Sequence, residues 1–209
     1  MASPAQDLDT PVLLLALPQV LDPFFHKSVV LLLHHGEEGS FGFIVNRPTG
    51  IRVMEILQGM EISWNGREDA LAYFGGPVQP QLGTVLFDRD RGHRGEGGGA
   101  GAPRPEQDDH ETATEILPGL AMSQHVGDLA ELATHPPSLF RLLLGYAGWG
   151  AGQLVKEILR NDWLTAPVSR DLLFADSADG VWEAAVRSVG VDPATLPSWT
   201  TDGDAGETN

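Results

Sequence analysis

The chain has 209 residues, of which 42% are hydrophobic and 20% charged, and this predicts one globular domain with a sizeable core. Because the sequence contains no cysteine, disulfides, thiolate nucleophiles, iron–sulfur clusters and cysteine-ligated zinc are excluded. The formal net charge of −16 repels phosphate backbones and anionic lipid surfaces, so direct nucleic-acid binding is disfavoured.

The first elements along the chain are predicted to be strands. The apolar run from Val12 to Leu17 is typical of a buried strand and is too short for a signal peptide or a membrane span, so we expect a cytoplasmic protein without membrane contact. Lys27 to His35 predicts a second strand and Phe41 to Asn46 a third. The turn residues from Gly36 to Ser40 between them predict a hairpin, and Pro48 is expected to end its second strand.

Short elements and turns alternate in the middle of the chain. Val53 to Leu57 has the spacing of a short helix, while Leu71 to Phe74 and Gly83 to Asp88 predict strands on either side of a Gly/Pro turn. Residues 89–111 are rich in glycine, arginine and acidic residues and cannot bury enough apolar surface to offset their ordering entropy. We therefore expect a flexible loop there.

After this loop the pattern resumes with predicted strands at 114–117 and 120–123 and a predicted helix at 126–134. Residues 138–144 predict a strand or a short helix that leads into a glycine run, 145–152. We expect this run to be a turn because clustered glycines reach left-handed backbone conformations.

An amphipathic helix is predicted directly after the glycine run and is expected to end near Trp163. The apolar stripe that should bury it against a sheet consists of Leu154, Val155, Ile158 and Leu159. A last helix is predicted from Asp179 to Val189, and the polar tail 197–209 is expected to be disordered.

The order of these elements predicts the fold class. Strands and helices are interspersed without a regular alternation, which favours an α+β fold with a largely antiparallel, strongly curved sheet over a doubly wound fold. We predict a single domain over residues 8–196.

The glycine run is the first candidate site because free backbone N–H groups at a helix start can bind an anion. Its spacing does not match the known templates, since Gln153 stands where a dinucleotide fingerprint requires glycine and Ala151 stands where a P-loop requires lysine. Close strand-to-helix packing is the alternative interpretation of these glycines.

Asn46-Arg47-Pro48 is the second candidate site. Arg47 could bind a carboxylate or phosphate through two N–H groups, and Asn46 could hydrogen-bond the same ligand. In the alternative interpretation Asn46 organises the turn and Arg47 pairs with a structural group.

No catalytic residue, metal ligand or cofactor is assigned. His34 and His35 are adjacent, and on a strand they point to opposite faces, so they could share a metal only with distortion. Ser28 lies beside Lys27 and His26, but the sequence contains no G-x-S-x-G elbow.

Four collinear motifs together resemble the YqgE/AlgH family of bacterial proteins. They are Leu17 to Val30, His35 to Pro48, Phe74 to Val78, and Gly145 to Leu154 with Asp162-Trp163-Leu164. The resemblance covers about Leu13 to Gly190 and departs from the usual family pattern in the long loop 89–111.

The resemblance implies a single α+β domain whose bent, mostly antiparallel, bifurcated sheet folds into a pseudo-barrel with helices packed outside. It implies no accepted catalytic residues, because the family is largely uncharacterised. The AlgH branch takes its name from a proposed regulatory role in alginate synthesis.

Two functional hypotheses follow. The preferred one is a non-enzymatic regulatory or interaction protein, with a transcriptional role implied by the resemblance and direct DNA binding disfavoured by charge. It would bind an unidentified protein or small molecule through three loops. Their residues are Asn46, Arg47, Pro48, Gly75, Gly76, Pro77, Gly148, Trp149, Gly150 and Gln153. The alternative is an enzyme of unknown type that holds a small anionic ligand through Arg47 and the amides of the glycine run.

Overall fold

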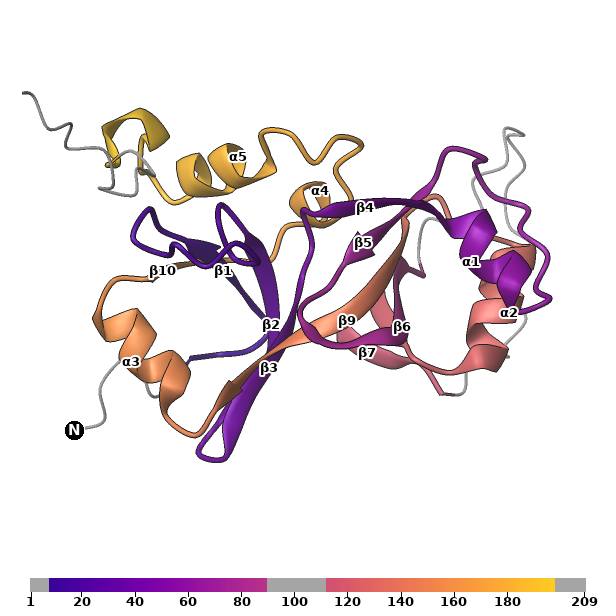
Figure 1. Ribbon diagram of the computed structural model, residues 1–209, viewed down its shortest axis with the longest axis horizontal. Coiled ribbons are helices and arrows are strands. Elements are labelled where there is room, and N and C mark those ends of the chain that lie inside the picture. The colour runs from indigo at the N-terminus through magenta and orange to yellow at the C-terminus, as the bar shows by residue number, and fades with distance from the viewer. Residues whose placement is uncertain (1–7, 90–111, 198–209) are drawn as a thin grey trace, which may run out of the picture. The chain divides into compact units, whose positions relative to one another are not determined.

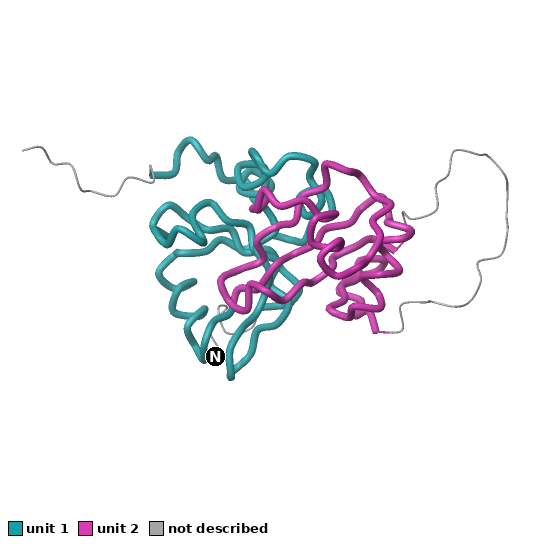
Figure 2. The backbone as a smooth tube through the Cα atoms, turned by 45° about the vertical axis from the view of Figure 1, so that its right-hand side comes forward, with its two compact units in different colours: residues 1–46, 148–209 teal, residues 47–147 magenta. Residues whose placement is uncertain are grey.

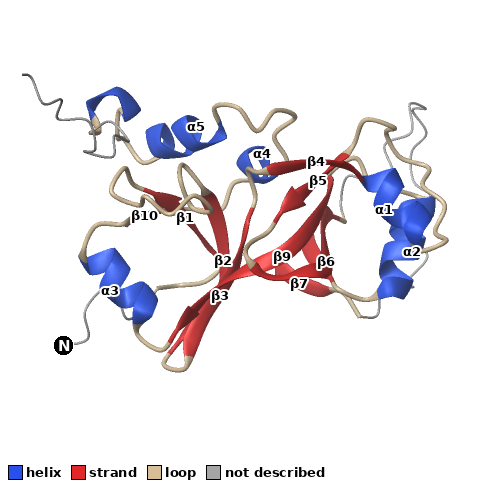
Figure 3. Cartoon of the chain, in the orientation of Figure 1, coloured by secondary structure: helices blue, strands red, loops and turns tan. Residues whose placement is uncertain are grey.

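Short helices are interspersed among the strands without a regular alternation (Figures 1 and 3). The computed structural model describes residues 8–89 and 112–197. The chain forms two compact units, coloured separately in Figure 2. Unit 1 contains the described residues up to Asn46 and those from Gly148 onward, and unit 2 contains Arg47–Ala147.

Unit 1 is built on four strands in the order β10-β1-β2-β3, each antiparallel to its neighbours. They are β1 (Val12–Ala16), β2 (Val29–Gly36), β3 (Gly39–Ile44) and β10 (Trp163–Ala166). In β1 the residues Leu13, Leu14 and Leu15 are all fully buried, so both faces of this central strand are covered. That explains why its sequence is a continuous apolar run rather than an alternating one.

Three α-helices belong to unit 1, namely α3 (Gln153–Leu159), α4 (Arg170–Leu173) and α5 (Val181–Ser188), followed by the 3₁₀ turn Pro193–Thr195. Helix α5 packs on β1, β2 and β10 and buries Val181, Trp182, Ala185 and Val186. The indole N–H of Trp182 donates to the carbonyl of Ala16 at 2.8 Å. The polar end of this buried ring is therefore satisfied, as burial of an indole requires.

The strands of unit 2 follow the order β4-β5-β9-β6-β8-β7. They are β4 (Pro48–Arg52), β5 (Leu71–Phe74), β6 (Val78–Asp88), β7 (Thr114–Leu117), β8 (Leu120–Ser123) and β9 (Phe140–Gly150). The β5–β9 pair is parallel, whereas the pairs β4–β5, β6–β8, β6–β9 and β7–β8 are antiparallel. β9 lies between β5 and β6 and is also hydrogen-bonded to β3, so the sheet branches at β9. The last residues of β9, from Gly148 onward, belong to unit 1.

Helices α1 (Val53–Gly59) and α2 (Val126–Thr134) provide the apolar core of unit 2 together with the sheet. Its buried side chains include Val53 and Leu57 of α1, Leu132 of α2, and Phe87 and Leu142 of the strands. None of the helices among the described residues has the length and hydropathy that crossing a bilayer requires.

The predicted fold class is confirmed as α+β with a bent, mostly antiparallel, bifurcated sheet. The predicted hairpin is also present, because β2 and β3 pair in antiparallel register through Glu37 and Glu38. The loop predicted at 89–111 and the tail predicted at 197–209 lie, apart from Arg89 and Pro197, outside the described residues. A single domain over residues 8–196 stays a prediction.

Several element boundaries were predicted wrongly. Gly145 to Gly150 is not a turn but the end of β9, and Pro48 begins the edge strand β4 instead of closing a hairpin. Helix α3 ends at Leu159 and not near Trp163, and Trp163 is the first residue of the strand β10. The predicted apolar stripe is buried only at Leu154, and Leu159 is 63% exposed.

Candidate functional site

Asn46 holds two backbone segments of unit 1 together. Its side-chain oxygen accepts from the backbone N–H of Val29 at 2.8 Å, and its amide nitrogen donates to the carbonyl of Lys27 at 2.9 Å. β3 ends at Ile44, two residues before Asn46. The Asn46 amide therefore extends the pairing between β3 and β2 by two hydrogen bonds, one to the first residue of β2 and one to the loop before it. The side chain is therefore occupied by the fold.

Lys27, whose carbonyl Asn46 binds, has a backbone φ of +50°, a left-handed conformation that is uncommon for a residue with a side chain. Its ammonium lies 3.3 Å from the carboxylate of Glu183 and 5.3 Å from the ring centroid of Trp182. Both partners belong to α5. The Asn46 amide thus fixes a residue that links the β1–β2 loop to that helix.

The loop at Arg47 and the loop at Gly75 are adjacent within unit 2. The carbonyl of Arg47 accepts from the backbone N–H of Phe74 at 2.7 Å, and Pro48 faces Tyr73 in the β4–β5 register. Arg47 is partly buried and Pro48 is exposed. Two of the three predicted loops are therefore brought together by strand pairing.

Glycine is required at position 76 because the backbone at Tyr146 lies very close to it. Its φ is +152°, and a Cβ at this position would lie 2.1 Å from the carbonyl carbon of Tyr146. Gly145, with φ of +70°, faces it from β9, since a Cβ there would lie 2.4 Å from the oxygen of Gly76. These two glycines serve packing between backbone segments. Gly75 is buried beside them and Pro77 is exposed.

The end of β9 and the first turn of α3 place Gly148, Trp149, Gly150 and Gln153 side by side in unit 1. Ala151 and Gly152 form the turn between the two elements, and Gly152 has a φ of +67°. The Gln153 side-chain oxygen accepts from the backbone N–H of Gly150 at 3.1 Å. Gln153 therefore closes the turn from the helix side. We call residues 150–152 the glycine turn.

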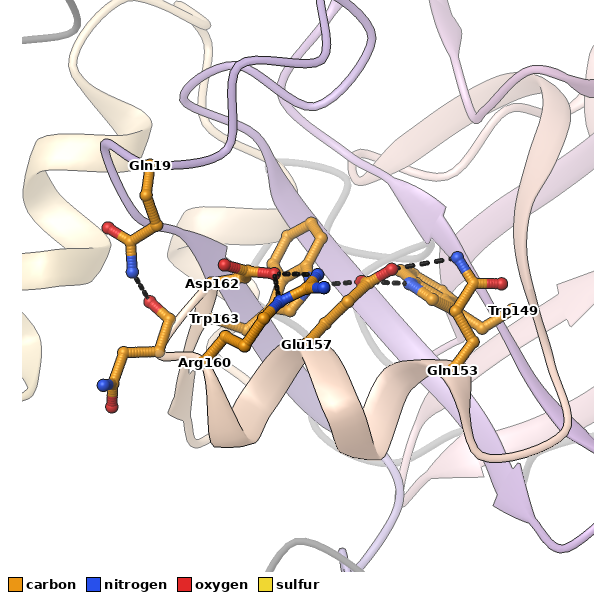
Figure 4. A network of polar contacts seen from close by, with 8 residues as sticks. Gln19, Trp149, Gln153, Glu157, Arg160, Asp162 and Trp163 are labelled. Atoms are coloured by element: carbon orange, nitrogen blue, oxygen red, sulfur yellow. Dashed lines mark hydrogen bonds and ion pairs between the residues drawn. The ribbon is translucent and has the colours of Figure 1, made fainter.

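Three side chains of this region donate hydrogen bonds to Glu157, which was not predicted as a site residue (Figure 4). One of its carboxylate oxygens accepts from the indole N–H groups of Trp149 and Trp163, each at 2.8 Å. Its other oxygen accepts from the side-chain amide of Gln153 at 2.9 Å. The carboxylate thus receives three hydrogen bonds from the end of β9, the start of α3 and the start of β10.

An aromatic cluster surrounds these bonds. The rings of Trp149 and Trp163 have centroids 5.9 Å apart in an edge-to-face arrangement, and Phe25 lies 6.0 Å and 5.7 Å from them. The two tryptophans are only 5% and 4% exposed. Because the three rings pack directly against one another, they form a small core rather than an open cage for a cation.

The end of α3 is held by a second set of contacts, of which those of Arg160 and Gln19 are drawn in Figure 4. Arg160 forms an ion pair with Asp162 at 2.6 Å, and the hydrogen bond and charge of Asp162 raise the pKa of Arg160. The side chain of Gln19 donates to the carbonyl of Asn161, and the backbone N–H of Leu17 donates to the carbonyl of Asp162 at 2.8 Å. These bonds join the β1–β2 loop to the chain that follows α3.

Two further polar contacts lie outside these regions. His35 and Ser40, a cross-strand pair in the hairpin, share a hydrogen bond of 2.7 Å. In unit 2 the guanidinium of Arg141 stacks 3.9 Å from the ring centroid of Tyr73, and both residues are largely buried. Within residues 8–89 and 112–197, no three His, Asp or Glu side chains gather as a metal site.

The predicted site residues therefore fall into two groups. Asn46, Gly148, Trp149, Gly150 and Gln153 belong to unit 1, whereas Arg47, Pro48 and Gly75 to Pro77 belong to unit 2. That the three loops share one pocket stays a prediction. Sequence analysis missed Glu157, for which the only signal was its position four residues after Gln153 on the predicted helix.

The fold and these motifs define an α+β protein of the AlgH type, and comparison with known proteins gives the family. The AlgH-like family matches residues 13–194, and the chain belongs to it. A UPF0301 protein of Myxococcus xanthus is 37% identical over 187 residues, with 89% of this chain and 93% of the relative covered. A UPF0301 protein of Ruegeria pomeroyi is 36% identical, with 88% and 93% covered.

Two solved structures share the fold. The solution structure of the AlgH protein from Pseudomonas aeruginosa has a TM-score of 0.65 and 32% sequence identity, covering 90% of this chain and 93% of that one. The crystal structure of a Corynebacterium diphtheriae protein has a TM-score of 0.67 and 23% identity, with 93% of each chain covered. The names of these relatives assign no reaction to the family.

Proposed function

We propose that this chain is a non-enzymatic interaction protein with a regulatory role, and that it binds a protein partner through the surface around α3. The proposal rests on one observation: the polar side chains of this region bond within the fold, whereas several of its large apolar side chains are exposed. Asn46, Gln153 and Glu157 direct their side chains at the fold itself, while Leu21, Phe24 and Leu159 of the same unit face solvent. Exposed apolar side chains mark a protein interface when they form one patch, and the proposal is that these three do.

The exposed side chains lie on α3 and on the β1–β2 loop. Leu159 is 63% exposed, and Leu21 and Phe24 in the loop are 56% and 47% exposed. The loop is joined to the chain after α3 by the bond from Leu17 to Asp162, and its Phe25 packs on Trp149 and Trp163. We define the α3 surface as Leu21, Phe24, the glycine turn and Leu159.

The partner is expected to lose affinity when the apolar side chains of the α3 surface become polar. The double variant Phe24→Ser/Leu159→Ser should retain at least tenfold less partner than the unmodified chain, because each interface leucine or phenylalanine contributes about 1 kcal/mol or more when buried. The measurement is quantitative affinity purification from bacterial lysate followed by mass spectrometry, with binding of the identified partner then measured by calorimetry.

The matched control is Leu71→Ser/Val126→Ser, which changes two residues of unit 2 that are 36% and 57% exposed. Both double variants should keep the melting temperature within a few degrees, because exposed substitutions usually alter stability by less than about 1 kcal/mol. Equal partner recovery with both double variants would place the interface elsewhere.

The alternative function, an enzyme that binds a small anion, makes a different prediction. In a thermal-shift screen over nucleotides, sugar phosphates and carboxylates, at least one compound would raise the melting temperature of the protein. Arg47→Ala would abolish this shift while the fold stays intact. Such a result would favour the enzyme over the interaction protein.

A further inference from the structure

The glycine turn begins at the end of a paired strand: Gly150 is the last residue of β9, which is hydrogen-bonded to β3, and Ala151 and Gly152 follow it. Gly150, Ala151 and Gly152 are exposed, and a Cβ added at Gly152 would meet nothing within 4 Å. Beyond the strand pairing of β9, the N–H of Gly150 donates to the side chain of Gln153, and the carbonyl of Gly152 accepts from the N–H of Lys156. Two glycines in three residues would let this segment sample many conformations.

One carboxylate adds side-chain bonds on both sides of the exposed turn. Gln153 can hold the N–H of Gly150 only if its own side chain is oriented, and its amide nitrogen is oriented by Glu157 at 2.9 Å. The same carboxylate binds Trp149, the residue immediately before the turn, at 2.8 Å. Both sides of the glycine turn are therefore fixed to a single side chain.

The chemistry of this carboxylate makes the arrangement sensitive to its charge. Both of its oxygens act as acceptors, and all three donors are N–H groups that cannot accept in return. Hydrogen bonds to an ionised acceptor are about twice as strong as those between neutral groups. A neutral amide in its place would turn an NH₂ group toward N–H donors and lose at least one of the bonds.

We propose that Glu157 is a conformational latch that keeps the glycine turn in one closed arrangement against α3, and that the turn opens when this carboxylate is lost. The inference rests on the proposed function, because the closed turn is part of the α3 surface that a partner meets. A partner that binds only the closed arrangement loses apparent affinity in proportion to the fraction of molecules that are open.

The test is amide hydrogen exchange measured residue by residue by NMR in the full chain. Glu157→Gln should raise the exchange rates of Gly150, Lys156 and the neighbouring amides at least tenfold, because these amides would exchange from a locally open state. The rates should not change in low concentrations of urea, which distinguishes local opening from global unfolding. Glu157→Asp, which keeps the charge on a shorter side chain, should restore part of the protection.

The matched control is Glu183→Gln. Glu183 is also a partly buried carboxylate of unit 1 that accepts from a side-chain donor, but it lies on α5 and binds Lys27. Its replacement should leave the exchange of the glycine turn unchanged. Unaltered exchange in Glu157→Gln, or an equal rise in exchange throughout unit 1, would overturn the latch.

The latch and the proposed function can fail separately. Local opening in Glu157→Gln with unchanged partner binding would keep the latch and show that the turn is not part of the interface. Loss of the partner in Phe24→Ser/Leu159→Ser with no exchange change in Glu157→Gln would keep the interface and reject the latch.

Discussion

Replacing Gly76 by alanine should reduce the free energy of unfolding by about 2–6 kcal/mol, combining backbone strain of about 1–3 kcal/mol with overpacking of about 1–3 kcal/mol. The φ of +152° disfavours any residue with a side chain, and the added Cβ would lie 2.1 Å from the carbonyl carbon of Tyr146. Since the obstacle is backbone in β9, no side-chain rotation can relieve it. Urea unfolding followed by circular dichroism measures the loss.

Gly50→Ala is the matched control for this prediction. Gly50 lies on β4 of the same unit and also has a positive φ, +80°, but a Cβ there meets nothing within 4 Å. Its replacement should cost about 1–2 kcal/mol, the penalty of the left-handed conformation alone. If both variants lost the same stability, the close approach between Gly76 and β9 would not be the reason for the glycine.

Asn46→Ala should reduce the free energy of unfolding by about 2–6 kcal/mol, because two partly buried backbone groups are each left without a partner at a cost of about 1–3 kcal/mol. The groups are the N–H of Val29 and the carbonyl of Lys27. Asn46→Asp should fall in between, since a carboxylate can still accept from Val29 but cannot donate to Lys27. Chemical denaturation of the three proteins gives the comparison.

The same experiment separates the two interpretations of the Asn46-Arg47-Pro48 motif. Asn65→Ala serves as control, because this exposed amide donates a single hydrogen bond to the carbonyl of Thr134 and should cost less than about 1 kcal/mol. A stable Asn46→Ala variant that had lost a ligand would assign Asn46 to binding rather than to the fold.

The strands and helices that the sequence predicted correctly share a local signal. The run of buried leucines before Ala16, the turn Glu37-Glu38 inside a hairpin and the apolar face of α5 each specify their structure within a few residues. The glycine run was predicted wrongly because glycine also occurs in strands where another backbone approaches closely. At Gly145 that backbone is the chain at Gly76, 69 positions earlier in the sequence.

The candidate site shows the same division. Trp149 and Gln153 were selected for their place beside the glycines, but their hydrogen-bond partners could not be inferred from spacing alone. Glu157 joins residues from β9, α3 and β10, and the strand β10 was itself predicted to be the end of a helix. A carboxylate among many in an acidic chain carries no signal of its own until the fold surrounds it with donors.

The sequence by itself determined the α+β class, the hairpin and the family to which the chain belongs, because these depend on short-range patterns and on four motifs in a fixed order. Only the tertiary structure decided what the motif residues do. Asn46 pairs with backbone at Lys27 and Val29, Gly76 admits the backbone of β9, and Glu157 collects three N–H donors. Hydrogen bonds and close contacts between residues far apart in the chain depend on how the elements pack, and local sequence patterns do not encode that packing.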